Sequence, residues 1–291
     1  MPIGRFSFML LAILIAAAAL AVDIDIYGGH DLASNGITAT EWGSGVVEQS
    51  SDVVLGEKSL KITTKGFYSG VSLTFATPID VSAAAIDSSN LFVFSLYLID
   101  SSSSGSNPSV NPYSGSASSV KPMKLLRATI MTDDNKRTEI YVPVVAKKGG
   151  AGWSSYGIPL TAFPNFAATS RKIKQLCVFG DIPATFYLGQ IRVASDSTSI
   201  SVDAYGNEGL KEINIANNDV ALLWAVGDAG PSIIKYTWDF DETDGFQEEA
   251  EGATIEHSFR KPGTFVVTVK ASDRFGTKKE ATSKITVKVA P

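Results

Sequence analysis

Apolar side chains recur at every second position in many short segments of this chain, the period of a β-strand with one buried face. In the C-terminal third, Tyr236, Trp238 and Phe240 share one face of such a segment. A second set alternates in the same way: Phe265, Val267, Val269 and Ala271. Pro262-Gly263 supplies the turn between the two segments. The pattern therefore predicts two strands that face one core.

The chain between residues 22 and 196 shows no helix pattern of convincing length, and Gly, Ser, Asn and Pro separate its apolar runs. We predict strands over Ser59–Thr63, Val71–Phe75, Leu91–Ile99, Leu125–Thr132, Glu139–Val145, Gln175–Phe179 and Thr185–Val193. Their number and spacing favour an all-β sandwich of the jelly-roll type. Ser101–Ser119 is rich in serine and glycine, which predicts a surface loop inserted between two strands.

A length of 291 residues favours two domains, and the polar run Ala194–Ser199 is the predicted boundary. We predict a first domain over residues 22–196 and a second over 197–291, preceded by a signal peptide over 1–21. Arg5 precedes an unbroken apolar run that leads to the small-x-small site Ala19-Leu20-Ala21. The alternative is a membrane anchor, but the run is short for a hydrocarbon core of ~30 Å. The expected protein is secreted or on the cell surface, with no membrane span after signal removal.

Composition also limits the possible cross-links, partners and source of the protein. Cys177 is the only cysteine, so no disulfide forms within the chain, and its apolar neighbours predict a buried thiol. A net charge of −5 without a basic patch argues against a nucleic-acid partner. The chain has no Asn-x-Ser/Thr acceptor for glycosylation, which favours a bacterial source.

Two motifs in the C-terminal third carry a family resemblance. The first is Trp238-Asp239-Phe240, and the second comprises His257, Phe259, Pro262, Gly263, Phe265, Val267 and Val269. They resemble the sequence marks of the PKD domain, a smaller immunoglobulin-like β-sandwich found in extracellular proteins. The turn Asp241–Gly245 departs from the tight Gly-Asp-Gly of that family. The resemblance implies a spacer or adhesion module and says little about chemistry.

A second resemblance lies in the first domain. Its motifs are Ile26-Tyr-Gly-Gly, Asp31-Leu-Ala-Ser-Asn-Gly36 with Trp42, Gly56-Glu-Lys-Ser-Leu-Lys-Ile62, Gly152-Trp-Ser-Ser-Tyr-Gly-Ile-Pro-Leu160 and Phe186-Tyr-Leu-Gly-Gln-Ile191. They are similar to carbohydrate-binding jelly rolls and galactose-binding-like domains attached to secreted glycoside hydrolases. Gly189-Gln190 stands where that family often has two acidic residues. The resemblance implies a polysaccharide ligand, and by analogy structural calcium near Asp23 and Asp25.

Strand parity points to candidate ligand contacts. If the alternating Phe and Leu positions face the core, four side chains lie on non-core faces: Tyr97, Arg127, Tyr141 and Tyr187. If their strands share a sheet, its outer face suits a sugar, because rings cover pyranose C–H faces and polar groups bind hydroxyls. The alternative is an ordinary amphipathic surface.

Further aromatic residues lie in loops or at strand ends, where they could rim such a site: Trp42, Tyr68 and Tyr156. The resemblance implies that Trp153 packs beneath it.

Metal and catalytic signals are weaker. Asp239, Asp241 and Asp244 resemble a calcium loop with one residue inserted, and a solvated acidic turn is the alternative reading. The chain has only two histidines and no nucleophile or phosphate motif. Asp133, Asp134 and Glu139 could serve a glycosidase, but they flank a polar hairpin turn. We expect no enzyme activity and no cofactor other than calcium.

The sequence thus predicts a non-catalytic protein whose jelly roll binds polysaccharide and whose second domain acts as spacer or docking unit. The alternative is a structural or adhesion protein that contacts other envelope or matrix proteins. Exposure of Tyr97, Tyr141 and Tyr187 distinguishes the two, because a sugar binder needs exposed rings.

Overall fold

The computed structural model describes residues 21–66, 68–99, 123–144 and 152–291. The predicted loop Ser101–Ser119 and nearly all of the predicted signal peptide lie outside this part of the chain. Within it, no helix is both long and apolar enough to cross a membrane. The only helices there are single 3-10 turns: η1 (Ala33–Asn35), η2 (Leu160–Ala162), η3 (Phe166–Ala168), η4 (Asn207–Gly209) and η5 (Glu242–Asp244).

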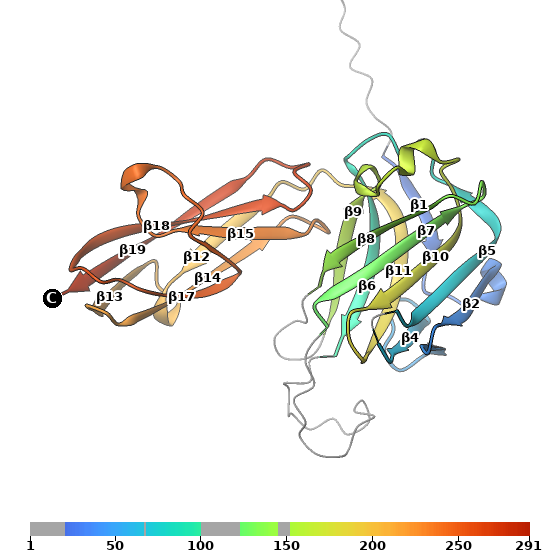
Figure 1. Cartoon of the computed structure of the whole chain (residues 1–291), viewed down its shortest axis with the longest axis horizontal. Coiled ribbons are helices and arrows are strands. Elements are labelled where there is room, and N and C mark those ends of the chain that lie inside the picture. Colours follow the sequence, from blue (N-terminus) through green and yellow to red (C-terminus); the bar gives the residue numbers. More distant parts are fainter. Residues whose placement is uncertain (1–20, 67, 100–122, 145–151) are drawn as a thin grey trace, which may run out of the picture.

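The first two thirds of the chain contain two antiparallel sheets packed face to face (Figure 1). Sheet A runs in the order β3 (Val46–Ser50), β4 (Ser59–Thr64), β11 (Ala184–Ser195), β6 (Asn90–Leu98) and β9 (Trp153–Pro159), with β1 (Asp23–Tyr27) also paired to β11. Sheet B runs in the order β2 (Ile37–Trp42), β5 (Gly70–Asp80), β10 (Lys172–Gly180), β7 (Leu125–Thr132) and β8 (Arg137–Pro143).

The core between these sheets follows the predicted alternation. Phe92, Phe94 and Leu96 of β6 are buried against the facing side chains of β7, which are Leu126, Ala128 and Ile130. Burial of such side chains from water is the main force that holds two sheets together. The all-β, jelly-roll prediction is confirmed, and all seven predicted segments overlap strands.

Two details of that prediction differ from the structure. β8 begins at Arg137 and ends at Pro143, two residues before the predicted range, because the turn that precedes it is tight. The four strands β1, β2, β3 and β9 were not predicted, because they are short and have few large aliphatic residues.

The last third forms a smaller sandwich of two sheets. One has the order β12 (Ser201–Tyr205), β14 (Val220–Asp228) and β17 (Thr254–Ser258). The other has the order β13 (Glu212–Ala216), β19 (Ala281–Ala290), β18 (Gly263–Asp273), β15 (Ile234–Asp239) and β16 (Ala250–Glu251), in which β13 and β19 run parallel. Trp238, Val267 and Val269 are fully buried in its core, as the alternation predicts.

The two sandwiches touch through turns of the second that lie beside β9 (Figure 1). The backbone N–H of Gly157 donates to the carbonyl of Pro231 at 2.6 Å. Ile233 belongs to the core of the first sandwich, and Phe275 packs against that core. The interface therefore combines an added backbone contact at the edge of sheet A with apolar burial.

Candidate functional site

The four residues predicted by parity lie on two different sheets. Tyr97 and Tyr187 are on β6 and β11 of sheet A, whereas Arg127 and Tyr141 are on β7 and β8 of sheet B. All four point away from the core between the sheets, so the two pairs lie on opposite outer faces. The expectation of one shared face is therefore wrong, because strand order rather than parity decides which strands are neighbours.

The pair on sheet A belongs to a packed aromatic cluster. Tyr97 pairs in register with Tyr187 on one side and Trp153 on the other, at ring-centroid distances of 6.0 and 5.8 Å. The indole N–H of Trp153 donates to the carbonyl of Val54 at 3.0 Å. Tyr187 is only 4% exposed, and burial raises its pKa. Tyr187 is thus a packing residue in this structure.

Sheet B carries a continuous row of outward positions, one from each strand, which we call the aromatic row. In register, and in sheet order, the row consists of Trp42, Gly70, Phe179, Arg127 and Tyr141. Gly70 has no side chain, so the ring of Trp42 reaches across it to pack edge-on against Phe179 at 6.2 Å between centroids.

Arg127 lies at the centre of this row. Its guanidinium carbon is 5.0 Å from the ring centroid of Phe179, 5.8 Å from that of Tyr141 and 5.3 Å from that of Tyr68. Such cation–π contacts are typical of arginine stacked on aromatic faces. Tyr68 comes from the turn before β5, where the Ser69 hydroxyl accepts the backbone N–H of Lys65 at 2.6 Å.

The residues around Arg127 differ in solvent exposure, so some form the base of the site and others its surface. Phe179 is fully buried and Arg127 is 9% exposed, so they form the base. Trp42 is 42% exposed, Tyr68 62% and Tyr141 40%. Three rings therefore offer apolar area to solvent on one face.

Glu139 holds Arg127 in position and also pairs with a second arginine, Arg137. Arg127 Nη2 donates to Glu139 Oε2 at 2.5 Å, and Arg137 Nη2 donates to the same oxygen at 3.0 Å. The hydrogen bond from Arg127 lowers the pKa of Glu139, so this carboxylate stays ionised at neutral pH. Among the described residues, Arg127 Nε has no hydrogen-bond partner although it is buried.

The row beside the aromatic row is polar. In sheet order it consists of Thr40, Ser72, Cys177, Thr129 and Glu139. Gln175 Nε2 donates to Ser72 Oγ at 2.7 Å, while the buried Thr129 Oγ1 finds no partner in the described part of the chain. Cys177 is buried, as predicted, and burial raises the pKa of its thiol. The face thus combines exposed rings with hydroxyl, amide and charged groups.

Sequence reasoning placed four residues of the aromatic site at outer or rim positions and missed Phe179; the four are Trp42, Tyr68, Arg127 and Tyr141. Phe179 lies in an apolar run. It can be identified as outward only because the even-numbered residues Leu176 and Val178 of the same strand face the core. Tyr156, expected at a rim, is instead buried in the core, where it stacks on Phe94 at 6.2 Å between centroids.

The acidic loop of the second sandwich is a hydrogen-bonded turn. Asp239 is buried, and its two carboxylate oxygens accept the backbone N–H groups of Asp241 and Gln247 at 2.9 and 3.0 Å. Asp241 accepts from the N–H of Thr243, and Asp244 accepts from the side-chain amide of Gln247. Over the described ranges, no three His, Cys, Asp or Glu side chains gather as a metal site would require.

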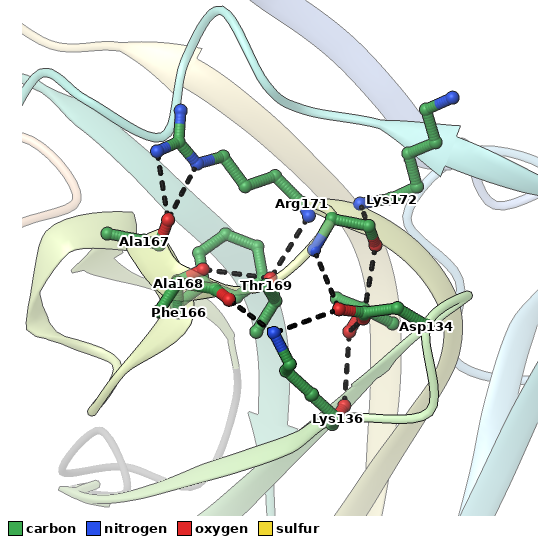
Figure 2. Close-up of polar contacts among 10 residues, drawn as sticks. Asp134, Lys136, Phe166, Ala167, Ala168, Thr169, Arg171 and Lys172 are labelled. Atoms are coloured by element: carbon green, nitrogen blue, oxygen red, sulfur yellow. Dashed lines mark hydrogen bonds and ion pairs between the residues drawn. The ribbon is translucent and has the colours of Figure 1, made fainter.

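The carboxylates near the β7–β8 hairpin also have structural partners. Figure 2 shows Lys136 between Asp134 and the carbonyl of Ala168, at 3.3 and 2.6 Å. Asp134 further accepts the backbone N–H of Ser170 at 3.2 Å. The hydroxyl of Thr132 at 2.5 Å is the main cause that lowers the pKa of Asp134 to about 2. An acid of that pKa is ionised at neutral pH and cannot donate a proton to a glycosidic oxygen.

Comparison with known proteins identifies part of the chain. Residues 212–288 match the model of the PKD domain. No curated protein matches the chain.

Several solved structures resemble it distantly. The β-1,2-glucanase from Parabacteroides distasonis is 13% identical over 92% of this chain, with a TM-score of 0.34. The family 11 carbohydrate-binding module from Clostridium thermocellum, solved with a β-1,3-1,4-mixed-linked tetrasaccharide, is 10% identical over 61% of this chain and 98% of its own, with a TM-score of 0.37. The chain spans 38% of the glucanase and 37% of the Endo-D glycoside hydrolase domain from Streptococcus pneumoniae R6, which is 14% identical over 86% of this chain with a TM-score of 0.34. The match over residues 212–288 confirms the resemblance to the PKD domain that Trp238-Asp239-Phe240 carries.

Proposed function

We propose that this chain is a non-catalytic, exported protein that binds polysaccharide through the outer face of sheet B. In this proposal residues 1–21 are a signal peptide, 22–196 the binding domain and 197–291 a spacer or docking domain. The aromatic row is the main support for this function, because exposed rings lie beside a buried arginine on one sheet face.

The chemistry of this face fits a sugar. Trp42, Tyr68 and Tyr141 present flat apolar surface that can cover the C–H face of a pyranose ring. Arg127 and Glu139 bring a donor and an acceptor to the same face, and sugar hydroxyls pair with both. Of the five predicted contacts, we retain Trp42, Arg127 and Tyr141, set aside Tyr97 and Tyr187, and add Tyr68. Phe179 packs beneath these residues.

The acidic groups support a binding rather than a catalytic role. A glycosidase needs one carboxyl group with a raised pKa as its general acid. Asp134 and Glu139 both have lowered pKa values and are engaged by Thr132 and Arg127.

Affinity electrophoresis of the full chain through gels that contain soluble polysaccharides tests the proposal. We expect at least one glycan to retard the wild type, and Trp42→Ala or Tyr141→Ala to reduce the retardation. Phe246→Ala is a matched control, because Phe246 is an exposed aromatic residue of the second sandwich. Equal retardation of all variants would show that the sugar site lies on another surface. Absence of retardation by every glycan would contradict the proposal.

A second candidate function is protein–protein contact, which β14 favours. Its outward side chains Val220, Leu222 and Val226 are exposed, although its alternate side chains already fill a core. Exposed apolar stripes of this kind often mark contact surfaces. Sedimentation analysis of wild type and Leu222→Ser tests it: concentration-dependent association that the substitution abolishes would support this function.

A further inference from the structure

We propose that the second sandwich binds a second copy of itself, and that the two copies pack face to face through the sheet of β12, β14 and β17 with their β14 strands antiparallel. This inference rests on the second candidate function and specifies its partner, and it does not depend on sugar binding by sheet B. Two features of the sheet support it: a continuous apolar stripe along β14 and opposite net charges at the two ends of that stripe.

The apolar stripe occupies the middle strand of this three-stranded sheet (Figure 1). Alternate residues of β14 are buried in the core of the second sandwich, and the others face outward. The outward set consists of Val220, Leu222, Trp224 and Val226, all exposed except the partly buried Trp224. At ~3.4 Å per residue the stripe is ~20 Å long. The ring of Tyr205 on β12 lies 6.0 Å from that of Trp224 between centroids, which widens the apolar area.

The strands on both sides of β14 are mostly polar on this face. Their exposed outward residues are Ser201, Asp203, Thr254, Glu256 and Ser258. An apolar centre inside a polar rim is the usual composition of a protein–protein interface. The sheet therefore has the form of a contact surface, although its inner face already fills a core.

A second copy of the sheet is a suitable partner because two β-sheets pack well face to face. Such sheets lie ~10 Å apart with their strands nearly aligned. In a symmetric pair both copies use the same surface, so the stripe of one copy covers the stripe of the other. A two-fold axis across the strands makes the β14 strands antiparallel and brings Val220 near the partner's Val226. An axis along the strands would make them parallel and bring each end onto the same end of the partner.

The end of the stripe near Val220 is basic. Ser258 of β17 pairs with Val220, and two exposed cations follow closely in the chain, Arg260 and Lys261. Neither cation forms an ion pair with a described residue. The carboxylate of Asp219 is adjacent, and it accepts a backbone N–H at 3.2 Å. Two cations beside one carboxylate leave this end with a net positive charge.

The opposite end of the stripe is acidic. Asp228 is the exposed last residue of β14, and Asp203 of β12 pairs in register with Val226. Lys211 Nζ donates to Asp203 Oδ1 at 2.8 Å, which leaves the carboxylate of Asp228 as the uncompensated charge. Antiparallel packing brings the Arg260 end of each copy to the Asp228 end of its partner, once on each side of the two-fold axis. Parallel packing would bring like charges together, which is unfavourable.

One charge near the middle of the sheet opposes association. Glu256 of β17 is exposed and pairs with Leu222, so the symmetric pair brings two Glu256 carboxylates toward each other at the rim. We therefore expect a weak, reversible dimer rather than a permanent one. Glu256→Gln removes this repulsion and should strengthen association roughly threefold.

Sedimentation equilibrium of the full chain over a series of protein concentrations tests the inference. We expect the wild type to show a reversible monomer–dimer equilibrium. Leu222→Ser places a polar group at the centre of the apolar stripe and should weaken the dimer at least about tenfold. Phe246→Ser is the matched control, because Phe246 is an exposed ring that lies over Lys270 on the other sheet. It should leave the equilibrium unchanged.

A charge swap tests the orientation of the two copies. Arg260→Asp should weaken the dimer, because it brings acidic groups together at both ends. Asp228→Asn should weaken it as well, since the amide oxygen still accepts the Gly230 N–H at 2.9 Å but the charge is lost. The double variant Arg260→Asp/Asp228→Arg restores opposite charges across the pair, so its association should return toward that of the wild type. Circular dichroism of each variant checks that it is folded.

The possible results separate the proposals from one another. Association that Leu222→Ser abolishes but that neither charge variant changes would overturn the antiparallel arrangement and leave the second candidate function standing. A wild type that stays monomeric at every concentration would overturn the inference and leave that function without a partner. Sugar binding is judged separately, by gel retardation of Trp42→Ala, because Trp42 lies on sheet B of the first sandwich.

Discussion

Individual side chains explain why the motifs of the second sandwich take the form they do. Trp238 is fully buried, and its indole N–H donates to the carbonyl of Gly252 at 2.8 Å. The next residue, Asp239, turns its carboxylate back onto two backbone N–H groups of the acidic loop. The Trp-Asp pair therefore fixes a core position and the adjoining turn together, which is a structural role.

Replacement of Trp238 should be among the most destabilising single changes in this sandwich. Trp238→Ala leaves a large cavity and an unpaired carbonyl, so we expect a loss of ~3–5 kcal/mol in the free energy of unfolding. Urea unfolding followed by circular dichroism measures this loss. Phe246→Ala, at an exposed position, should cost much less. Similar midpoints for both variants would show that Trp238 contributes little to the core.

His257 makes stability depend on pH near neutrality. Its ring stacks on Phe240 at 3.7 Å between centroids, and burial lowers its pKa below 6.5 although Glu249 acts in the opposite direction. The unfolded chain therefore binds a proton at a pH where the folded chain does not. We expect the free energy of unfolding to fall as pH decreases from about 8 to about 5. In His257→Phe this part of the pH dependence should disappear, and an unchanged profile would contradict the assignment.

Strands and turns set the shape of the proposed binding face. The β7–β8 hairpin brings Arg127 opposite Tyr141, and its turn is closed by Asn135, whose φ of 60° lies in the left-handed region. Asn135 also accepts a hydrogen bond from Lys174 on β10. The turn thus fixes the register on which the Arg127 contacts depend.

The conformation of Asn135 gives a graded prediction. Asn135→Gly should change the free energy of unfolding by less than ~1 kcal/mol, because glycine adopts positive φ without strain. Asn135→Val should cost ~1–2 kcal/mol, because a β-branched residue is strained there. Thermal unfolding of the two variants provides the comparison. Equal stability of glycine and valine would mean that the turn relaxes to another conformation.

The two sandwiches are joined by a buried ion pair as well as by apolar contacts. Lys278 Nζ lies 2.5 Å from Asp196 Oδ2 and 2.7 Å from the carbonyl of Ala229, and both charged side chains are almost fully buried. The lysine thus ties the second sandwich to the last residues of the first. Together with the Gly157–Pro231 contact, it makes the junction an ordered part of the molecule.

Removal of one partner of this pair should uncouple the two halves. Lys278→Ala leaves the buried Asp196 without its counter-ion, at an expected cost of ~3–5 kcal/mol. Calorimetry should then show two unfolding transitions, one for each sandwich, that are further apart in temperature than in the wild type. Lys284→Ala is the matched control, because the pair of Lys284 with Glu242 is solvent-exposed. Identical calorimetric profiles for both variants would contradict a role for Lys278 in coupling.

The alternation of apolar and polar residues predicted more of the fold than of the candidate binding site. Alternation predicted the outward positions of Arg127 and Tyr141, because parity depends only on neighbouring residues. It did not predict that Tyr97 and Tyr187 lie on the other sheet, because strand order depends on contacts between distant segments. Phe179 was missed for a related reason: its place in the site depends on Gly70, which opens the space between two rings and has no pattern of its own.

The ordered junction also has a consequence for proteases. A protease needs an accessible, extended segment, and exposed linkers between domains are the usual points of attack. Here Asp196 donates its backbone N–H to Ser89 and buries its side chain, and Ile200 is buried as well. Only Ser197, Thr198 and Ser199 are exposed between these two anchors, so we expect limited digestion to cut here more slowly than in an unanchored linker and the two sandwiches to stay largely on one fragment. Lys278→Ala removes the ion pair with Asp196, so we expect cleavage at this junction to be faster in that variant than in the wild type.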